Sequence, residues 1–256
     1  MSAERNKDFE RTEESIKKID ALSLDELDKV KLLNRVDSKY VIHIKDFPEI
    51  LEEIKSDYKV LQIENKRIHQ YESLYFDTED FALYKYHHND KQDRFKVRYR
   101  KYLDTGLCYF EIKYKEKGNR TDKVRAKRVD IDLNLSEADI KMIEHDLIKG
   151  EMLQKKVWVY LDRITLANNN FKERITLDLN IKFDNYRTQK YFPELVVCEI
   201  KQEKSSYSSS IIKACTKRHY EQTGFSKYST AIAMMEDVKN NNFKPNFIKI
   251  NKLING

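Results

Sequence analysis

The 256-residue sequence has few cysteines, few glycines and no long apolar run. Its three cysteines, Cys108, Cys198 and Cys215, are widely spaced and odd in number, without the C-x-x-C pairs of zinc sites or the pattern of a disulfide framework. This usage favours a reducing, cytoplasmic setting. Because about 18 consecutive apolar residues occur nowhere, the sequence predicts neither a secretory signal nor a spanning helix. Attachment at the inner face of a membrane would need a protein partner.

Charge is abundant but nearly balanced. Lysine and arginine number 49 and acidic residues 43, which gives a net charge of +6, a weaker field than that of dedicated nucleic-acid binders. The chain also lacks the glycine-rich aromatic motifs of common RNA modules, so no nucleic acid is expected as a partner. With 5 glycines and 16 tyrosines, the composition is typical of a folded domain rather than a disordered or fibrous chain.

Cations alternate along the stretch 94–115. In an extended strand successive side chains point to opposite faces, so every second residue from Arg94 to Arg100 places a cation on the same face. After a turn, a second alternation puts Glu111 and Lys113 on one face. Two neighbouring strands with this many cations on one face repel each other unless an anion lies between them. The pattern therefore predicts a bound polyanion.

Similar alternations recur in several other strand-like segments. A flat sheet with one charged, solvated face explains the charges on any single pair of strands, but not their recurrence in so many strand-like segments. If the sheet is instead a closed antiparallel β-barrel with flanking helices, an α+β fold, alternate residues of every strand point into its lumen. The cations predicted to share this face are Arg35, Lys39, Arg98, Arg100, Lys113, Lys123, Arg125, Arg163, Arg174, Lys201 and Lys227, with Asp37, Glu111, Asp178 and Glu199 among them.

A lumen of this composition suits a chain of phosphates. Arginine binds phosphate oxygens through two parallel hydrogen bonds, and lysine contributes a positive charge on a flexible side chain. A hard divalent cation prefers oxygen ligands and bridges phosphates, so one or two carboxylates among many cations form the expected metal-binding site.

Seven sequence blocks occur in the order found in one known family: RVDSKYVI, LYFDT, FKVRYRKY, FEIKYKEKGNRTDKVR, ERITLDLNIKF, VVCEIKQ and FSKY. From about Asn34 to Ala231 the chain resembles the polyphosphate polymerase domain of the vacuolar transporter chaperone (VTC) type. That domain belongs to the triphosphate tunnel metalloenzyme, or CYTH-like, superfamily. The resemblance implies an antiparallel barrel around a basic tunnel, in agreement with the alternation of charges.

The resemblance also implies an activity, namely transfer of the ATP γ-phosphoryl group onto a growing polyphosphate chain with the help of Mn²⁺ or Mg²⁺. It assigns Glu199 to the metal. The implied catalytic cations are Lys39, Arg98, Arg100, Lys113, Arg163, Arg174 and Lys227, and the further substrate-binding cations are Arg35, Lys123, Arg125 and Lys201. No serine, cysteine or histidine receives a covalent role.

Two alternatives remain open. The hydrolytic relatives begin with a Glu-x-Glu-x-Lys strand, whereas this chain has Arg35-x-Asp37-x-Lys39 with one carboxylate, which favours polymerase over triphosphatase. A non-catalytic module that only binds polyphosphate is the other alternative. The chain lacks the phosphate-sensing and membrane-spanning parts of eukaryotic family members, so coupling of synthesis to transport would require docking on a membrane-protein partner.

Three residues have two interpretations each. Glu111 either binds metal or orients Lys113 or Arg100 by ion pairing, and we favour the ion pair. His87 and His88 read as neighbours on a strand, where they point apart, and no carboxylate lies at a ligand spacing. A structural or phosphate-proximal role is therefore favoured over a metal site.

The predicted organisation has three parts: an N-terminal helical arm over 1–30, the tunnel domain over 31–240 and a C-terminal tail over 241–256. Helical patterns predict helices over 4–30, with Ser23 and Glu26 in a capping box, and over 47–54. Further expectations are a strand at VDIDL (129–133), a helix from Ser136 to Gly150, and helices over about 209–222 and 229–239.

Overall fold

The computed structural model describes residues 3–28, 30, 36–115, 121–143, 152–203 and 209–255. These residues form one 11-stranded sheet surrounded by helices, which confirms the α+β class. The main path of the sheet is entirely antiparallel. Its order is β2 (Val36–His43), β11 (Leu195–Gln202), β9 (Glu173–Asp184), β8 (Gln154–Asn168), β4 (His69–Asp77), β5 (Arg94–Tyr102), β6 (Cys108–Lys115) and β7 (Thr121–Arg128).

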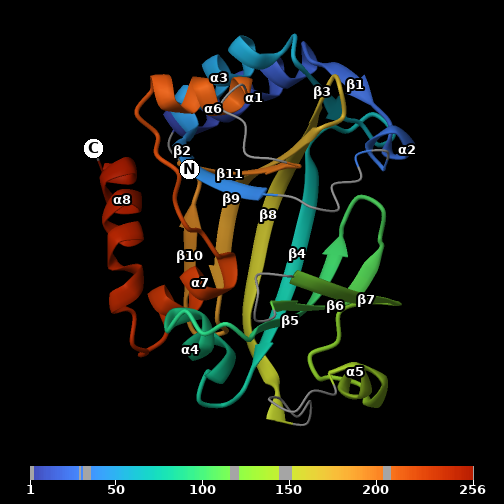
Figure 1. Cartoon of the computed structure of the whole chain (residues 1–256), viewed down its shortest axis with the longest axis vertical. Coiled ribbons are helices and arrows are strands. Elements are labelled where there is room, and N and C mark those ends of the chain that lie inside the picture. Colours follow the sequence, from blue (N-terminus) through green and yellow to red (C-terminus); the bar gives the residue numbers. More distant parts are fainter. Residues whose placement is uncertain are drawn as a thin grey trace.

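Three short strands extend this path. β3 (Tyr58–Leu61) pairs with β8 and, in parallel, with β1 (Asp20–Leu22). β10 (Gln189–Phe192) forms a hairpin with β9. In Figure 1 β6 and β7 run across the direction of β8 and β9, which shows how strongly the sheet twists. Register shifts in β4 and β8 add to the twist that strands accumulate from neighbour to neighbour.

The sheet is open rather than closed. β2 and β7 are the two ends of the path, and the described residues show no pairing between them, so the predicted closed barrel is not found. Alternating cations identify the shared face of each strand. They do not specify the strand number, tilt and stagger that closure requires. A curved open sheet satisfies the same alternation.

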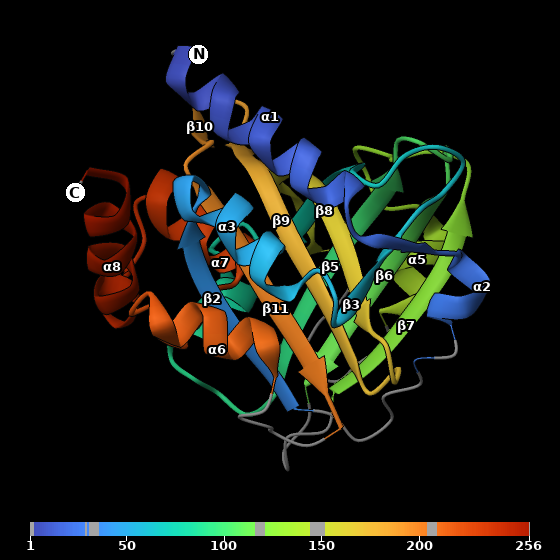
Figure 2. The same cartoon turned by 90° about the horizontal axis from the view of Figure 1, so that it is seen from above.

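Helices cover the sheet beside β2, β11 and β9. α1 (Ala3–Lys17) contacts α3 (Phe47–Ile54), which contacts α6 (Ser210–Lys217), and Figure 2 shows the three lying over these strands. Ile16 and Ile19 from the predicted arm are buried in the same core as the apolar residues of α3. Pro48 in the first turn and apolar residues at helical spacing explain why α3 forms where the sequence predicts it.

A second group of helices contacts the sheet at β8 and β2. α4 (Ala82–His88) contacts α7 (Lys227–Met235), and α8 (Lys244–Asn255) contacts β2. α8 follows a 3₁₀ turn (Asn241–Phe243), so the predicted tail is largely helical, with Ile250 buried. None of the helices in the described ranges combines the length and apolar character needed to cross a membrane.

Several local predictions need correction. The helix expected over 4–30 ends at Lys17 and is followed by β1 and the short α2 (Leu24–Leu27), although Ser23 and Glu26 do form the capping box. VDIDL is not a strand, whereas the preceding segment, β7, is. Ser136 caps α5 (Glu137–Met142) as predicted, but the expected end at Gly150 lies outside the described residues. α6 ends at Lys217, about a turn earlier than expected.

Candidate active site

The curved face of the sheet and the start of α7 line a cavity of about 430 Å³. Two carboxylates, Glu111 and Glu199, also line it. Among the described residues its basic side chains are Lys39, Lys96, Arg98, Arg100, Lys113, Lys123, Arg125, Arg163, Arg174, Lys201 and Lys227. Every catalytic, substrate-binding and metal residue named from the sequence therefore lies here except Arg35, which is outside the described residues. Asp37 and Asp178, which were predicted on the same face, do not line the cavity. The contributing strands are β2, β5, β6, β7, β8, β9 and β11.

Strand register explains this convergence. On one face of an antiparallel pair, directly opposite residues are neighbours. Glu111 lies opposite both Arg98 and Arg125. In the same way Glu199 lies opposite Lys39, and Lys201 lies opposite Arg174. Alternation within each strand and register between strands together place distant charges on one surface.

Glu111 holds two of the cations. Arg98 donates to Glu111 Oε2 from Nε at 2.9 Å and from Nη2 at 2.6 Å, and Lys123 pairs with the other carboxylate oxygen. Burial raises the pKa of the Glu111 carboxyl, but the nearby charges of Arg98, Arg100 and Lys123 outweigh it, so the pKa is lowered. The favoured ion-pair role of Glu111 is thus found, but its partners are Arg98 and Lys123 rather than Lys113 or Arg100.

Asp178 holds a second pair of cations below the cavity surface. Arg163 donates to it from Nε at 2.6 Å and from Nη2 at 2.9 Å, and Lys227 at the start of α7 pairs with the same carboxylate. The carboxylate is fully buried. Burial opposes its charge, yet Arg163 and Lys227 lower the pKa below its ordinary value. This charged triad joins β8, β9 and α7.

Glu199 is the carboxylate best placed for a metal. Its Oε1 accepts from Lys201 Nζ at 2.8 Å, and Lys201 and Lys39 lower its pKa well below the ordinary value despite burial. In the described part of the chain no three His, Cys, Asp or Glu side chains form a metal-binding group. The donor set does fit Mg²⁺ or Mn²⁺ held by one carboxylate together with phosphate oxygens and water, which is the usual arrangement for such ions.

Three of the remaining basic side chains donate hydrogen bonds to neutral groups. Lys39 donates to the Phe225 carbonyl at 2.9 Å, and Arg100 donates to Ser73 Oγ at 3.2 Å. Lys96 donates to Ser226 Oγ at 2.9 Å, and the Ser226 hydroxyl in turn caps α7. The cavity therefore holds a large excess of positive charge, as required for binding a polyanion. Sequence reasoning did not place Lys96 among the site residues, although it shares a strand face with Arg98 and Arg100.

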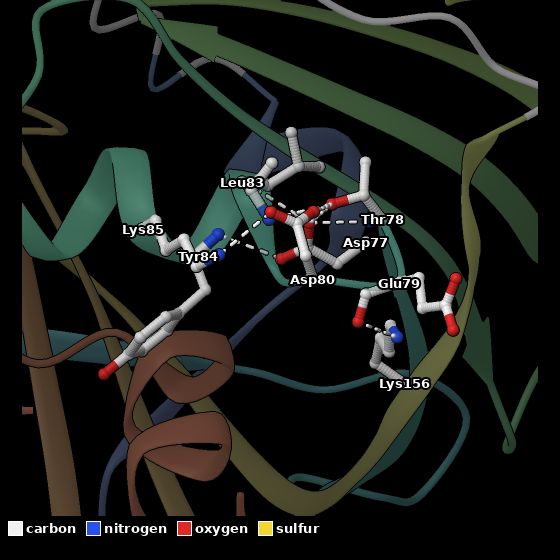
Figure 3. Close-up of polar contacts among 9 residues, drawn as sticks. Asp77, Thr78, Glu79, Asp80, Leu83, Tyr84, Lys85 and Lys156 are labelled. Atoms are coloured by element: carbon white, nitrogen blue, oxygen red, sulfur yellow. Dashed lines mark hydrogen bonds and ion pairs between the residues drawn. The ribbon is translucent and has the colours of Figure 1, made fainter. Parts of the chain in front are cut away.

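Asp77 anchors two helices, α4 and α7, and the first residues of α7 line the cavity. Asp77 is the last residue of β4. Its carboxylate accepts hydrogen bonds from the backbone N–H groups of Thr78 and of Leu83 and Tyr84, and the last two lie in the first turn of α4 (Figure 3). It also accepts the hydroxyl of Tyr228, the second residue of α7, which lines the cavity next to Lys227. Burial raises the pKa of Asp77, against the effect of these hydrogen bonds. One buried carboxylate thus ties β4, α4 and α7 together.

Replacing Asp77 with alanine should lower the free energy of unfolding by on the order of 3 kcal/mol, because it leaves several buried donors without an acceptor. Urea unfolding followed by circular dichroism measures this loss. Asp80→Ala is the matched control, since Asp80 belongs to the same turn (Figure 3) but is largely exposed. Equal losses in the two variants would show that Asp77 is not the anchor.

The two histidines lie in the last turn of α4, so the predicted strand there is wrong. His88 contacts Asn89 and Asn242, a structural role at the packing of α4 against the C-terminal segment. His87 lies 3.4 Å from Arg94, and burial together with Lys96 and Arg94 lowers its pKa to about 3. It is therefore uncharged near neutral pH.

A larger cavity, of about 610 Å³, lies at the ends of β8, β9 and β11. Three acids and one lysine line it, so it does not suit a polyanion. Its buried acid, Glu173, already accepts hydrogen bonds from Tyr58, Gln202 and Ser209. Charge, rather than volume, distinguishes the candidate active site.

Known structures resemble the chain at low identity. A candidate adenylate cyclase from Vibrio parahaemolyticus is 12% identical, and the match covers 78% of this chain and 99% of that chain with a TM-score of 0.47. A candidate adenylyl cyclase from Hippeastrum with a dominant triphosphatase activity is 12% identical over 81% of this chain and 99% of that one, with a TM-score of 0.48. A protein from Pyrococcus horikoshii is 14% identical over 73% and 91%, with a TM-score of 0.41.

No curated protein matches the chain. A family model does match, over residues 34–236, and that is most of the sequence. The matched range contains every side chain that lines the cavity apart from Val30. The chain belongs to the VTC domain family.

Proposed function

We propose that the protein is a polyphosphate polymerase that transfers the γ-phosphoryl group of ATP to a polyphosphate chain held in the cationic cavity. The observation that carries this proposal is the convergence of eleven basic side chains from seven strands and α7 around one cavity with two carboxylates, within the described residues. Membership of the VTC domain family supports the same substrate class.

The reaction needs no protein nucleophile. A terminal oxygen of the polyphosphate attacks the γ-phosphorus of ATP, the bond from that phosphorus to the β–γ bridging oxygen breaks, and ADP leaves. The protein supplies alignment of the phosphates and charges that stabilise the transition state. The three cysteines are all buried, and burial raises the pKa of each thiol, so they do not offer reactive thiolates.

The buried acids hold these charges in place. Glu111 fixes Arg98 and Lys123, and Asp178 fixes Arg163 and Lys227. Side chains fixed in this way lose little conformational entropy when the phosphates arrive. Glu199 would hold Mn²⁺ or Mg²⁺, which would neutralise charge on the transferred group when bound.

Incubation with ATP and a panel of divalent cations, followed by gel separation of the products, tests the proposal. Polymerase activity gives ADP together with chains that a polyphosphate stain detects. Orthophosphate released from ATP or tripolyphosphate without polymer would indicate a triphosphatase instead. Tight, salt-sensitive binding without turnover on any metal would indicate a binding module.

Arg98→Ala should weaken both polyphosphate binding and turnover, because Arg98 is a fixed donor in the cavity wall. Loss of one charge-assisted contact costs about 1.5–3 kcal/mol, or roughly 10- to 150-fold in affinity. Isothermal titration calorimetry with tripolyphosphate measures the change. Lys101→Ala is the control, since Lys101 lies on the same strand but pairs with Asp130. Retained affinity in Arg98→Ala would exclude Arg98 from the binding site.

A further inference from the structure

Lys96 differs from the other lysines of the cavity in the charges around it. Lys123, Lys201 and Lys227 each pair with a carboxylate. Glu199 lies directly opposite Lys39 in the pair formed by β2 and β11, and its negative charge favours the protonated form of Lys113. Lys96 forms no ion pair among the described residues, and its hydrogen bond goes to the neutral Ser226 hydroxyl. It is a lysine without a counter-ion.

The charges that act most strongly on Lys96 are all positive. β6 places Lys113 directly opposite it. Lys39 from β2 and Arg94 and Arg98 from its own strand all act on its charge, and His87 of α4 lies within electrostatic range. The nearby acids have other partners, since Asp77 on β4 caps α4 and Glu199 on β11 pairs with Lys201. Burial and these cations lower the pKa of Lys96 well below its ordinary value.

We propose that Lys96 is a further phosphate-binding residue, and that entry of a polyphosphate chain, which supplies the missing counter-ion, is coupled to uptake of a proton by Lys96. The incoming phosphate oxygens replace the missing counter-ion and offset the repulsion from Lys39, Lys113 and Arg98. The proton comes from solvent and ends on Lys96 Nζ, which then donates to a phosphate oxygen. This inference rests on the proposed function only in requiring that the cavity binds polyphosphate, because it needs no turnover.

Proton uptake by the whole protein tests the proposal directly. Long-chain polyphosphate is the probe, because its interior phosphates stay ionised near neutral pH and contribute no proton of their own. Calorimetric titrations in buffers of different ionisation enthalpy give the number of protons taken up on binding. Lys96→Arg keeps a charge at all relevant pH values, and Lys96→Met keeps the length without a charge. Both variants should take up fewer protons than the wild type, by up to one.

The pH dependence of affinity provides a second readout. As pH rises above the pKa of Lys96 in the empty cavity, protonating Lys96 on binding becomes more costly, so the affinity of the wild type should fall by up to about tenfold per pH unit relative to Lys96→Arg. Lys101→Arg is the matched control, because Lys101 lies on the same strand as Lys96 but pairs with Asp130 outside the cavity, so its replacement should leave the proton count as in the wild type.

The outcomes are distinct. Equal proton uptake by the wild type and both Lys96 variants, or parallel affinity profiles for the wild type and Lys96→Arg, overturns the role of Lys96 while polyphosphate binding stands. Absence of any polyphosphate binding by the wild type overturns the proposed function itself. If one variant fails to fold, the other variant and the wild-type proton count still decide the result.

Discussion

Asp178→Asn should lower the free energy of unfolding by about 3–5 kcal/mol, the cost typical of removing one member of a buried ion pair. Arg163 and Lys227 both depend on this carboxylate, and the asparagine amide cannot neutralise either cation. Urea unfolding measures the loss. Tripolyphosphate should restore part of the stability in the variant, because a bound anion supplies the missing negative charge.

Acid should affect the wild type and this variant differently. The pKa of Asp178 is lower in the folded protein than in the unfolded chain, so the unfolded chain binds more protons at low pH. The stability contributed by Asp178 is therefore complete above about pH 5 and is lost progressively as pH falls through the unfolded pKa toward the folded one. Asp178→Asn should lose less stability than the wild type between about pH 5 and pH 3.

Asp184→Asn is the matched control for Asp178→Asn. Asp184 ends the same strand, where it accepts hydrogen bonds from Tyr186 and Gln189 instead of holding two buried cations. Its replacement should cost much less stability, and its pH dependence should follow that of the wild type. A similar loss in both variants would mean that the triad with Arg163 and Lys227 does not stabilise the fold.

Glu199→Gln should reduce metal-dependent turnover by at least about 100-fold, a loss typical of removing one preorganised electrostatic group, and should leave polyphosphate binding intact. The reason is that Glu199 is the cavity carboxylate not occupied by an arginine, whereas Glu111 and Asp178 each hold one. Its removal also releases Lys201 to meet phosphate, so affinity should be unchanged or higher. Steady-state ADP release and calorimetry with polyphosphate measure the two quantities.

Glu221→Gln serves as the control for Glu199→Gln, since Glu221 is exposed and pairs with Lys249 away from the cavity. The metal response separates two explanations of lost activity. A variant that recovers at high Mn²⁺ concentration has a weakened metal site, whereas one that binds no polyphosphate has a damaged cavity. Unchanged turnover in Glu199→Gln would remove Glu199 from the metal site.

The strand faces could be predicted because the side-chain period of a strand is two. Lys39, Arg98, Lys113 and Glu199 alternate with apolar residues, and that pattern alone identified them as neighbours on a common face. Helix α3 could also be predicted, from the proline in its first turn and from apolar residues that repeat at helical spacing. His87 and His88 were wrongly predicted to lie on a strand, because the pattern of a short aromatic segment does not distinguish a strand from a short helix.

Other features depend on contacts between distant segments. Register across β5, β6 and β7 decides that Glu111 meets Arg98 and Lys123 rather than its sequence neighbours. Packing of α7 against the sheet brings Lys227 to Asp178 and Ser226 to Lys96. These partners lie from about a dozen residues to 130 residues apart in the sequence, so no local pattern indicates them.

By itself the sequence determined which side chains are cationic, and it predicted which of them share a strand face and that an anion lies among them. For the residues that it describes, the tertiary structure alone decided that the sheet stays open, which acid neutralises which cation and that Lys96 forms no ion pair. The physical reason is that alternation is a property of one strand, whereas charge neutralisation depends on the register and curvature that several strands adopt together.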